Sequence, residues 1–180
     1  DTTRGPLCIN ITAFGEVPAG QALLRSGARA GDDLWVSGTL GDARLALEAF
    51  RGSLSLPEAV FAAARDRMEQ PQPRVALGLA LRGVATSAID ISDGLLGDLA
   101  HVLDRSAVGA TIDAQVAMTL LAASRDLALP SPQVLELVLA GGDDYELAFT
   151  APPDARAAVV AASQDAGTLV TRIGTIDAAP

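Results

Sequence analysis

The chain has 180 residues, 49% of them hydrophobic, and its 13 basic residues face 22 acidic ones for a formal net charge of −9. All the basic residues are arginine, which excludes Schiff-base catalysis, pyridoxal phosphate anchoring and a Walker A phosphate loop, since each needs a lysine. One histidine and one cysteine exclude the usual structural and protease zinc sites and an internal disulfide. The acidic balance opposes binding to nucleic acid or to an anionic membrane surface.

The side chains that remain for chemistry are Asp, Glu, Ser, Thr and Arg, a set that suits Mg²⁺ and phosphate. A nucleophile pair of Cys8 and His101 is formally possible, but Cys8 stands in an apolar run, which favours a position in the core. The apolar runs are too short for a membrane span and a signal peptide is not recognised, so we expect a cytoplasmic protein. The chain begins at Asp1 without a methionine, and we expect it to be part of a longer protein.

Strand-like and helix-like segments alternate along most of the chain. The predicted strands are 7–17, 34–40, 87–91, 109–113, 145–150 and 169–176. The predicted helices are 42–50, 57–68, 74–85, 95–106, 118–127, 132–140 and 153–166. This alternation predicts a single α/β domain over 1–180, built in layers with a mixed sheet covered by helices.

The segment 95–106 is the most clearly amphipathic helix. Leu95, Leu99 and Val102 fall on one face, whereas Asp98 and His101 fall elsewhere. We therefore expect an amphipathic helix that packs on the sheet.

The segment Ala-Ile-Asp-Ile-Ser-Asp-Gly at 88–94 joins a predicted buried strand to this helix. Open α/β sheets bind ligands at such strand ends. Asp90 and Ser92 are two positions apart on an extended segment and should project to the same side, and Asp93 follows at the bend. These oxygens could hold a divalent cation with its phosphate. Alternatively, Ser92 or Asp93 is only the N-cap of the helix, which leaves Asp90 unexplained.

A second polar segment, Leu-Ala-Gly-Gly-Asp-Asp-Tyr-Glu-Leu at 139–147, separates a predicted helix from a predicted strand. Its glycines permit close approach of the backbone to a ligand, and the adjacent Asp143 and Asp144 repel each other unless they are solvated, paired or bound to a cation. A helix C-cap followed by a turn explains the same residues equally well.

Two further segments carry less information. Asp-Thr-Thr-Arg-Gly-Pro at 1–6, with the later Arg25, is compatible with phosphate or metal binding, although a frayed polar terminus explains it as well. The glycine-bearing turn Val-Ser-Gly-Thr-Leu-Gly-Asp at 36–42 lacks the spacing of either nucleotide-binding glycine motif, so we interpret it as structural.

Taken together, DTTRGPL, LLRSGARAGDDLWVSGTLGDA, PRVALGLALRG, SAIDISDGLLGDL and GGDDYELAFT, in this order, resemble the bacterial thiamine-monophosphate kinase family of the aminoimidazole ribonucleotide synthetase superfamily. The resemblance implies that this chain is the C-terminal α/β domain of a two-domain enzyme whose N-terminal domain, which binds ATP and Mg²⁺, is absent. It also implies a homodimeric parent enzyme that transfers the γ-phosphoryl group of ATP to thiamine monophosphate.

The resemblance also implies roles for individual residues. Asp1, Asp90 and Asp93 correspond to Mg²⁺ ligands of the family. Arg25 and Ser92 correspond to residues that contact ATP. For Asp1 and Arg25 these roles rest mainly on the resemblance.

Asp143 corresponds to the family residue that contacts the thiamine moiety.

The chain departs from the family at Gln70, where an arginine is frequent, and at its end, because the family's final segment with a substrate-stacking aromatic residue would follow Pro180. Several metal-binding acids of the family belong to the absent half, so we do not expect this chain to catalyse alone. Two alternatives stay open: a catalytically silent nucleotide-binding or assembly module, and an ATP-dependent relative with another substrate.

Overall fold

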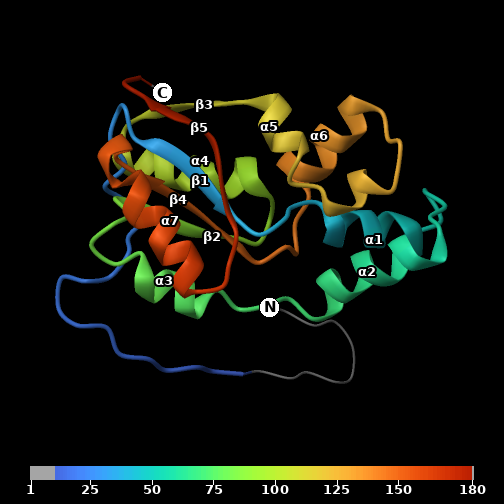
Figure 1. Cartoon of the computed structure of the whole chain (residues 1–180), viewed down its shortest axis with the longest axis horizontal. Helices are drawn as coiled ribbons and strands as arrows, with labels where there is room; N and C mark the ends of the chain where they lie inside the picture. Colours follow the sequence, from blue (N-terminus) through green and yellow to red (C-terminus); the bar gives the residue numbers. More distant parts are fainter. Residues whose placement is uncertain (1–10, 180) are drawn as a thin grey trace.

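The computed structural model describes residues 11–179 of the chain (Figure 1). Its strands are β1 (Asp33–Ser37), β2 (Ser87–Ile91), β3 (Gly109–Ile112), β4 (Glu146–Ala151) and β5 (Val170–Asp177). Its α-helices are α1 (Asp42–Phe50), α2 (Glu58–Glu69), α3 (Val75–Ala80), α4 (Leu95–Ser106), α5 (Ala114–Met118), α6 (Ser131–Ala140) and α7 (Arg156–Asp165). Two short 3₁₀ helices, η1 (Ala122–Arg125) and η2 (Pro153–Ala155), complete the described elements.

The strands form one sheet in the order β2-β4-β1-β5-β3, and each of these pairings is antiparallel. The α/β class is confirmed, but the prediction of a mixed sheet was wrong. Alternation of strands and helices defines only local segments. Strand direction depends on which strands pair, and β1 pairs with β4 and β5, which are far away in the sequence.

Helices cover both faces of the sheet, and α1, α2, α5 and α6 gather beyond one end of it (Figure 1). The larger apolar cluster includes Leu34 and Val36 of β1 together with side chains of α1, α4 and α6. The smaller cluster includes Trp35 and Phe149, which stack with ring centroids 6.3 Å apart, and side chains of α3 and α7. Alternate residues of β1 thus belong to opposite clusters, which is why this strand is buried on both faces.

Sequence patterns predicted α1 and α4 with the bounds that the structure has. The strand predicted at 7–17 does not form over 11–17, and its first four residues lie outside the described part. There Ile11 and Phe14 are almost fully exposed, so their apolar side chains do not cover a sheet face.

Three predicted helices also differ from the observed elements. The helix predicted at 74–85 ends at Ala80, before turns that include Gly83 with a positive φ of 75°. The helix predicted at 118–127 is replaced by the end of α5, a turn and η1. The helix predicted at 153–166 is divided into η2 and α7. These segments have helical composition, but short turns divide or end them.

Candidate functional site

The two polar segments at 88–94 and 139–147 meet in the structure. The N–H of Asp143 donates to the carbonyl oxygen of Ser92 at 2.8 Å, and the N–H of Tyr145 donates to that of Ile91 at 2.9 Å. A Cβ atom on Gly142 would lie only 2.7 Å from the oxygen of Ser92, so the close approach of the two backbones requires a glycine. Antiparallel pairing of β2 with β4 therefore turns two separate motifs into one site.

Asp98 of α4 holds the loop that carries Ser92 and Asp93. Its Oδ2 accepts hydrogen bonds from the N–H of Ser92 at 2.8 Å and from that of Asp93 at 3.0 Å. Gly94 occupies the N-cap position of α4 without a side-chain cap, so the alternative in which Ser92 or Asp93 caps this helix was wrong. The side chain of Asp98 is buried beneath the loop, although it falls outside the apolar face of the helix.

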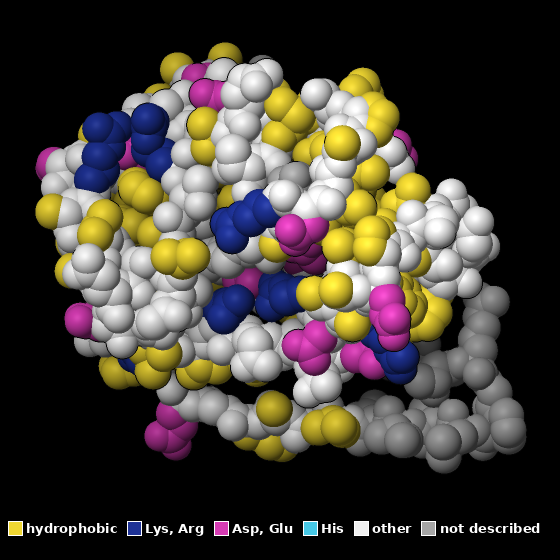
Figure 2. Space-filling model, turned by 45° about the vertical axis from the view of Figure 1, so that its right-hand side comes forward, with side chains coloured by type: hydrophobic (Ala, Val, Ile, Leu, Met, Phe, Trp, Pro, Cys, Tyr) yellow, Lys and Arg dark blue, Asp and Glu magenta, His cyan; other side chains and the backbone are white. Residues whose placement is uncertain are grey.

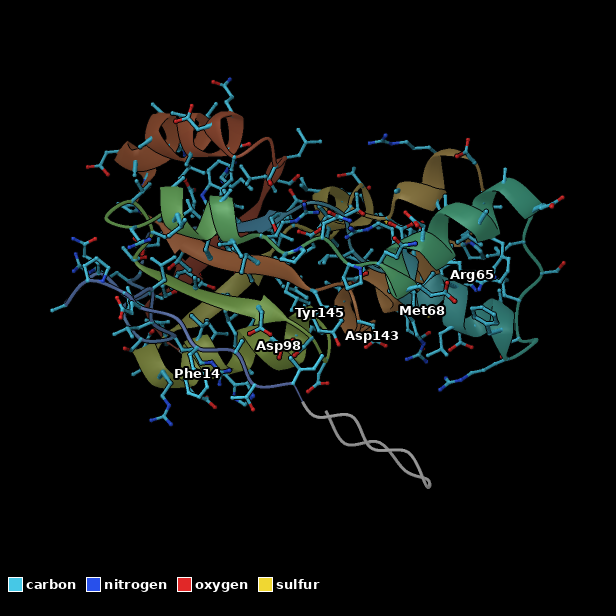
Figure 3. All side chains as sticks on the ribbon, turned by 90° about the horizontal axis from the view of Figure 1, so that it is seen from below. Phe14, Arg65, Met68, Asp98, Asp143 and Tyr145 are labelled. Carbon is cyan, nitrogen blue, oxygen red and sulfur yellow. The ribbon has the colours of Figure 1, made fainter. Side chains whose placement is uncertain are left out.

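Residues 143–146 alternate between the surface and the interior. Asp144 and Glu146 are buried, whereas Asp143 and Tyr145 are exposed. Asp143 and Tyr145 have positive φ values of 68° and 52°, which side-chain-bearing residues adopt infrequently and often at functional sites. Asp143 and Tyr145 lie next to each other in the view from below (Figure 3).

Negative charge concentrates around the hydroxyl group of Tyr145. Partial burial raises the pKa of Tyr145, and so do the charge of Asp143, with which it forms a hydrogen bond, and the charges of Asp93 and Asp90. Three carboxylates on two segments are thus close enough to one phenol group to act on it. Each of these negative charges disfavours ionisation of the phenol group.

Arg25 and Asp90 come together at an open cavity of about 490 Å³, with Arg74 and Tyr145. The remaining walls are mostly apolar, and these lining residues are Leu23, Val75, Gly78, Ala88, Ile89 and Leu147. Ser92 is half-buried beside Asp93 and Asp143, both of which are exposed at the junction of the two segments. The sequence-predicted Asp1 lies outside the described residues.

The exposed oxygen-bearing side chains of this site are of the type that Mg²⁺ takes when it is shared with phosphate. Within residues 11–179, the structure has no group of three or more His, Cys, Asp or Glu side chains that could hold a metal ion. Mg²⁺, however, commonly takes one or two carboxylates and completes its shell with water and substrate phosphates. Asp90 and Asp93, both exposed, provide two such carboxylates.

The glycine-bearing turn at 36–42 has a structural role, as predicted. Gly38 has a φ of 58° and lies against Glu146, whose carboxylate occupies the place of a Cβ atom. Gly41 lies against the backbone of α6 and donates its N–H to Oδ2 of Asp144 at 2.8 Å. The turn therefore accommodates the two buried acids of the 139–147 segment.

The sequence patterns did not predict Asp98, Arg74 and Glu146 as residues of this site, and they indicated no role for Tyr145. Asp98 stands in the first turn of α4, where acidic residues are common, so its position alone gives little information.

None of the helices in the described part of the chain is long and apolar enough to cross a membrane.

Residues 29–180 match the family model described as AIR synthase related protein, C-terminal domain. The thiamine-monophosphate kinase of Salmonella typhimurium LT2 is 41% identical over 179 residues, which are 99% of this chain and 54% of that protein. The chain thus spans about half the length of the curated relatives it matches.

Solved structures agree with these matches. The crystal structure of thiamine-monophosphate kinase from Stenotrophomonas maltophilia K279a is 44% identical with a TM-score of 0.81, over 91% of this chain and 52% of that one. AaThiL complexed with AMPPCP and TMP is 30% identical with a TM-score of 0.68, over 87% of this chain and 48% of that one. The sequence match, the antiparallel sheet and the joined polar segments lead to one conclusion: the chain belongs to the family of AIR synthase related proteins and has the fold of their C-terminal domain.

Proposed function

We propose that this chain is the C-terminal part of a thiamine-monophosphate kinase, which transfers the γ-phosphoryl group of ATP to thiamine monophosphate. The observation that carries the proposal is the convergence of the two polar segments beside a cavity lined by Arg25 and Asp90. Identity of 41–44% to thiamine-monophosphate kinases and similarity to a relative that binds AMPPCP and TMP support it.

The chemistry of this reaction suits the side chains that are present. Phosphoryl transfer depends mainly on positioning and on neutralisation of charge, with little covalent chemistry by protein groups. Arg25 is proposed to contact ATP, and Ser92 to contact its phosphates. The exposed carboxylate of Asp143 is proposed to contact the thiamine moiety, whose ring is cationic.

Asp90 and Asp93 are proposed to hold Mg²⁺, together with Asp1. When bound, Mg²⁺ would neutralise charge on the phosphate oxygens. Asp98 would keep the Asp93 backbone in place through its hydrogen bond at 3.0 Å. The remainder of a two-domain, homodimeric parent enzyme would supply the further metal ligands.

The test is the Asp90→Asn substitution in the full-length protein. This change removes a metal ligand at almost constant volume, and we expect kcat to fall by about 100-fold or more without a change in Tm. Formation of ADP and thiamine diphosphate should be measured together, with thiamine monophosphate compared with other acceptors.

Asp104→Asn is the matched control, because Asp104 is an exposed carboxylate of α4 outside the site. It should retain wild-type turnover. Turnover of Asp90→Asn at the wild-type rate would contradict the metal assignment, and a wild-type protein that phosphorylates a different acceptor would contradict the proposed substrate.

A further inference from the structure

A buried carboxylate shared by two arginines lies next to the site. Glu146, the first residue of β4, is fully buried. Its Oε1 accepts from Nη2 of Arg67 at 2.7 Å and from Nη2 of Arg74 at 2.6 Å. Its Oε2 accepts from Nε of Arg74 at 2.7 Å and from the hydroxyl of Ser37 at 2.5 Å. Two guanidinium groups thus share this one carboxylate, and Arg67 also interacts with the charges of Asp42 and Asp144.

Glu146 fixes the orientation of Arg74. The two-point contact through Nε and Nη2 is the fork geometry that restricts a guanidinium group most strongly. The hydrogen bond to Glu146 raises the pKa of Arg74, against the opposing effect of burial, so the group stays charged. Since Nε and Nη2 each donate one hydrogen to Glu146, both hydrogens of Nη1 and the second hydrogen of Nη2 are left to bind another acceptor.

Arg74 and Arg67 share Glu146 but face different spaces. Arg74 has an 18% exposed side chain and lines the cavity that contains Arg25, Asp90 and Tyr145. Arg67, whose side chain is 22% exposed, lines a separate cavity of about 610 Å³ between α2 and η1. Figure 2 shows arginine side chains gathered near the middle of one face, with acidic side chains among them.

The cavity combines two guanidinium groups with one carboxylate. Within residues 11–179, neither Arg25 nor Arg74 forms an ion pair with Asp90. Neither arginine therefore neutralises this carboxylate, and Arg25 and the part of the Arg74 guanidinium group that does not face Glu146 are left to bind an anion. Phosphate oxygens are well matched to guanidinium groups in charge and geometry.

We propose that Arg74 binds a phosphate group in this cavity, and that Glu146 is the residue that positions it. The inference rests on the proposed function in one respect: the phosphate belongs either to the nucleotide or to the acceptor. Both sources offer the same non-bridging oxygens to the guanidinium group of Arg74.

The experiment compares Arg74→Met with Arg67→Met in the full-length protein. Both changes remove one positive charge from Glu146, but only Arg74 lines the cavity. Calorimetric affinities should be measured for ATP, ADP, AMP and adenosine, and separately for thiamine monophosphate and thiamine. We expect Arg74→Met to lower the affinity for those ligands that carry the phosphate contacted by Arg74, by about 10-fold to 100-fold. The affinities for adenosine and thiamine, which carry no phosphate, should not change. If the affinities for the nucleotides fall, the phosphate belongs to the nucleotide; if the affinity for thiamine monophosphate falls, it belongs to the acceptor.

Arg67→Met should leave all these affinities within about twofold, whatever its effect on Tm. Arg74→Lys keeps the charge but loses the fork, so it should give an intermediate affinity and a raised KM for the same ligand with kcat less affected. Equal losses in Arg74→Met and Arg67→Met would overturn the proposal, because they would indicate a purely structural role for the cluster. Unchanged affinity in Arg74→Met would overturn it too. If Arg74→Met does not fold, the lysine variant decides by the same criteria.

A failure of the proposed function would look different. Inorganic tripolyphosphate provides the same oxygens without a base or a thiamine group. One outcome is that the wild-type protein binds tripolyphosphate, that Arg74→Met lowers this affinity, and that the wild-type protein makes no thiamine diphosphate. In that case the phosphate site is supported and the kinase assignment is wrong. If thiamine diphosphate is made normally by Arg74→Met with unchanged KM values, the kinase assignment stands and the phosphate site fails.

Discussion

At the scale of single residues, the acids of the 139–147 segment divide into two kinds. Asp143 is at the surface of the site, whereas Asp144 is buried and accepts the N–H of Gly41 at 2.8 Å, next to the start of α1. Burial is the main cause that raises the pKa of Asp144 to about 7, and the nearby charge of Asp42 raises it further, although the N–H groups of Gly41 and Ala43 oppose the shift. One acid of the pair is thus exposed at the candidate site, and the other is part of the buried scaffold.

The raised pKa of Asp144 predicts a dependence of stability on pH. The folded chain binds a proton more tightly than the unfolded chain between pH 3.8 and about 7. The free energy of unfolding therefore contains a contribution that is complete below pH 3.8 and is lost as the pH rises through about 7. Its slope approaches about 1.4 kcal/mol per pH unit.

Asp144→Asn should remove this slope, because an amide keeps an acceptor oxygen but does not ionise. Urea unfolding of both proteins from pH 5 to pH 8 measures the difference between them, which cancels the contribution of the other carboxyl groups. If the free energies of unfolding of the wild type and the variant depend on pH in the same way, Asp144 is ionised in the folded chain throughout this range.

At the scale of the elements, an ion pair attaches α7 to the central strand of the sheet. Asp33 begins β1 and is buried. Its Oδ2 accepts from Nε of Arg156 at 2.6 Å and its Oδ1 from Nη2 at 2.8 Å. Nη1 of Arg172 in β5 adds a longer contact to Oδ1 at 3.3 Å. The hydrogen bond from Arg156 is the main cause that lowers the pKa of Asp33.

Arg156→Met should lower the free energy of unfolding by about 1–3 kcal/mol, because a buried carboxylate loses its two short hydrogen bonds and keeps only the contact with Arg172. Chemical denaturation at neutral pH measures the effect. Arg51→Met is the control, since Arg51 forms an exposed pair with Glu48 at 3.4 Å. Such surface pairs contribute up to about 1 kcal/mol and often nothing measurable. Equal losses in the two variants would show that the Asp33 pair has no special role.

At the scale of the whole molecule, one sheet separates two apolar clusters that share its strands. In β1, Leu34 and Val36 belong to the larger cluster and Trp35 to the smaller one. In β4, Ala148 belongs to the larger cluster and Phe149 to the smaller one. Neither cluster can lose its packing without exposing strands on which the other depends.

This sharing predicts a single cooperative unfolding transition. The only tryptophan of the chain is Trp35, so its fluorescence reports on the smaller cluster, whereas far-ultraviolet circular dichroism reports on all helices. The two urea curves should coincide. Phe149→Ala should move both transitions to a lower urea concentration, because it lowers the free energy of unfolding by about 3–5 kcal/mol. A fluorescence transition that precedes loss of helix would show that the smaller cluster unfolds by itself.

The sequence predicted part of the fold and part of the site. Apolar periodicity gave α1 and α4 because their burial pattern has a helical period. The residue types of Asp90, Ser92 and Asp93 at a strand end indicated a ligand site, and the structure brings this segment against Asp143. The strand expected at 7–17 does not form over 11–17, because an apolar segment becomes a strand only where another strand pairs with it.

The sequence by itself determined the available chemistry, since oxygen ligands and arginines without lysine restrict this chain whatever its fold. It also determined the elements whose patterns are local. Tertiary structure alone decided strand direction and the burial of Asp98, Asp144 and Glu146, because burial and pairing depend on residues distant in sequence. Ser37 and Glu146, for example, are hydrogen-bonded across 109 positions of the chain. A carboxylate has the same composition in solvent and in the interior, and only its neighbours in space make it a ligand, a helix cap or the anchor of an arginine.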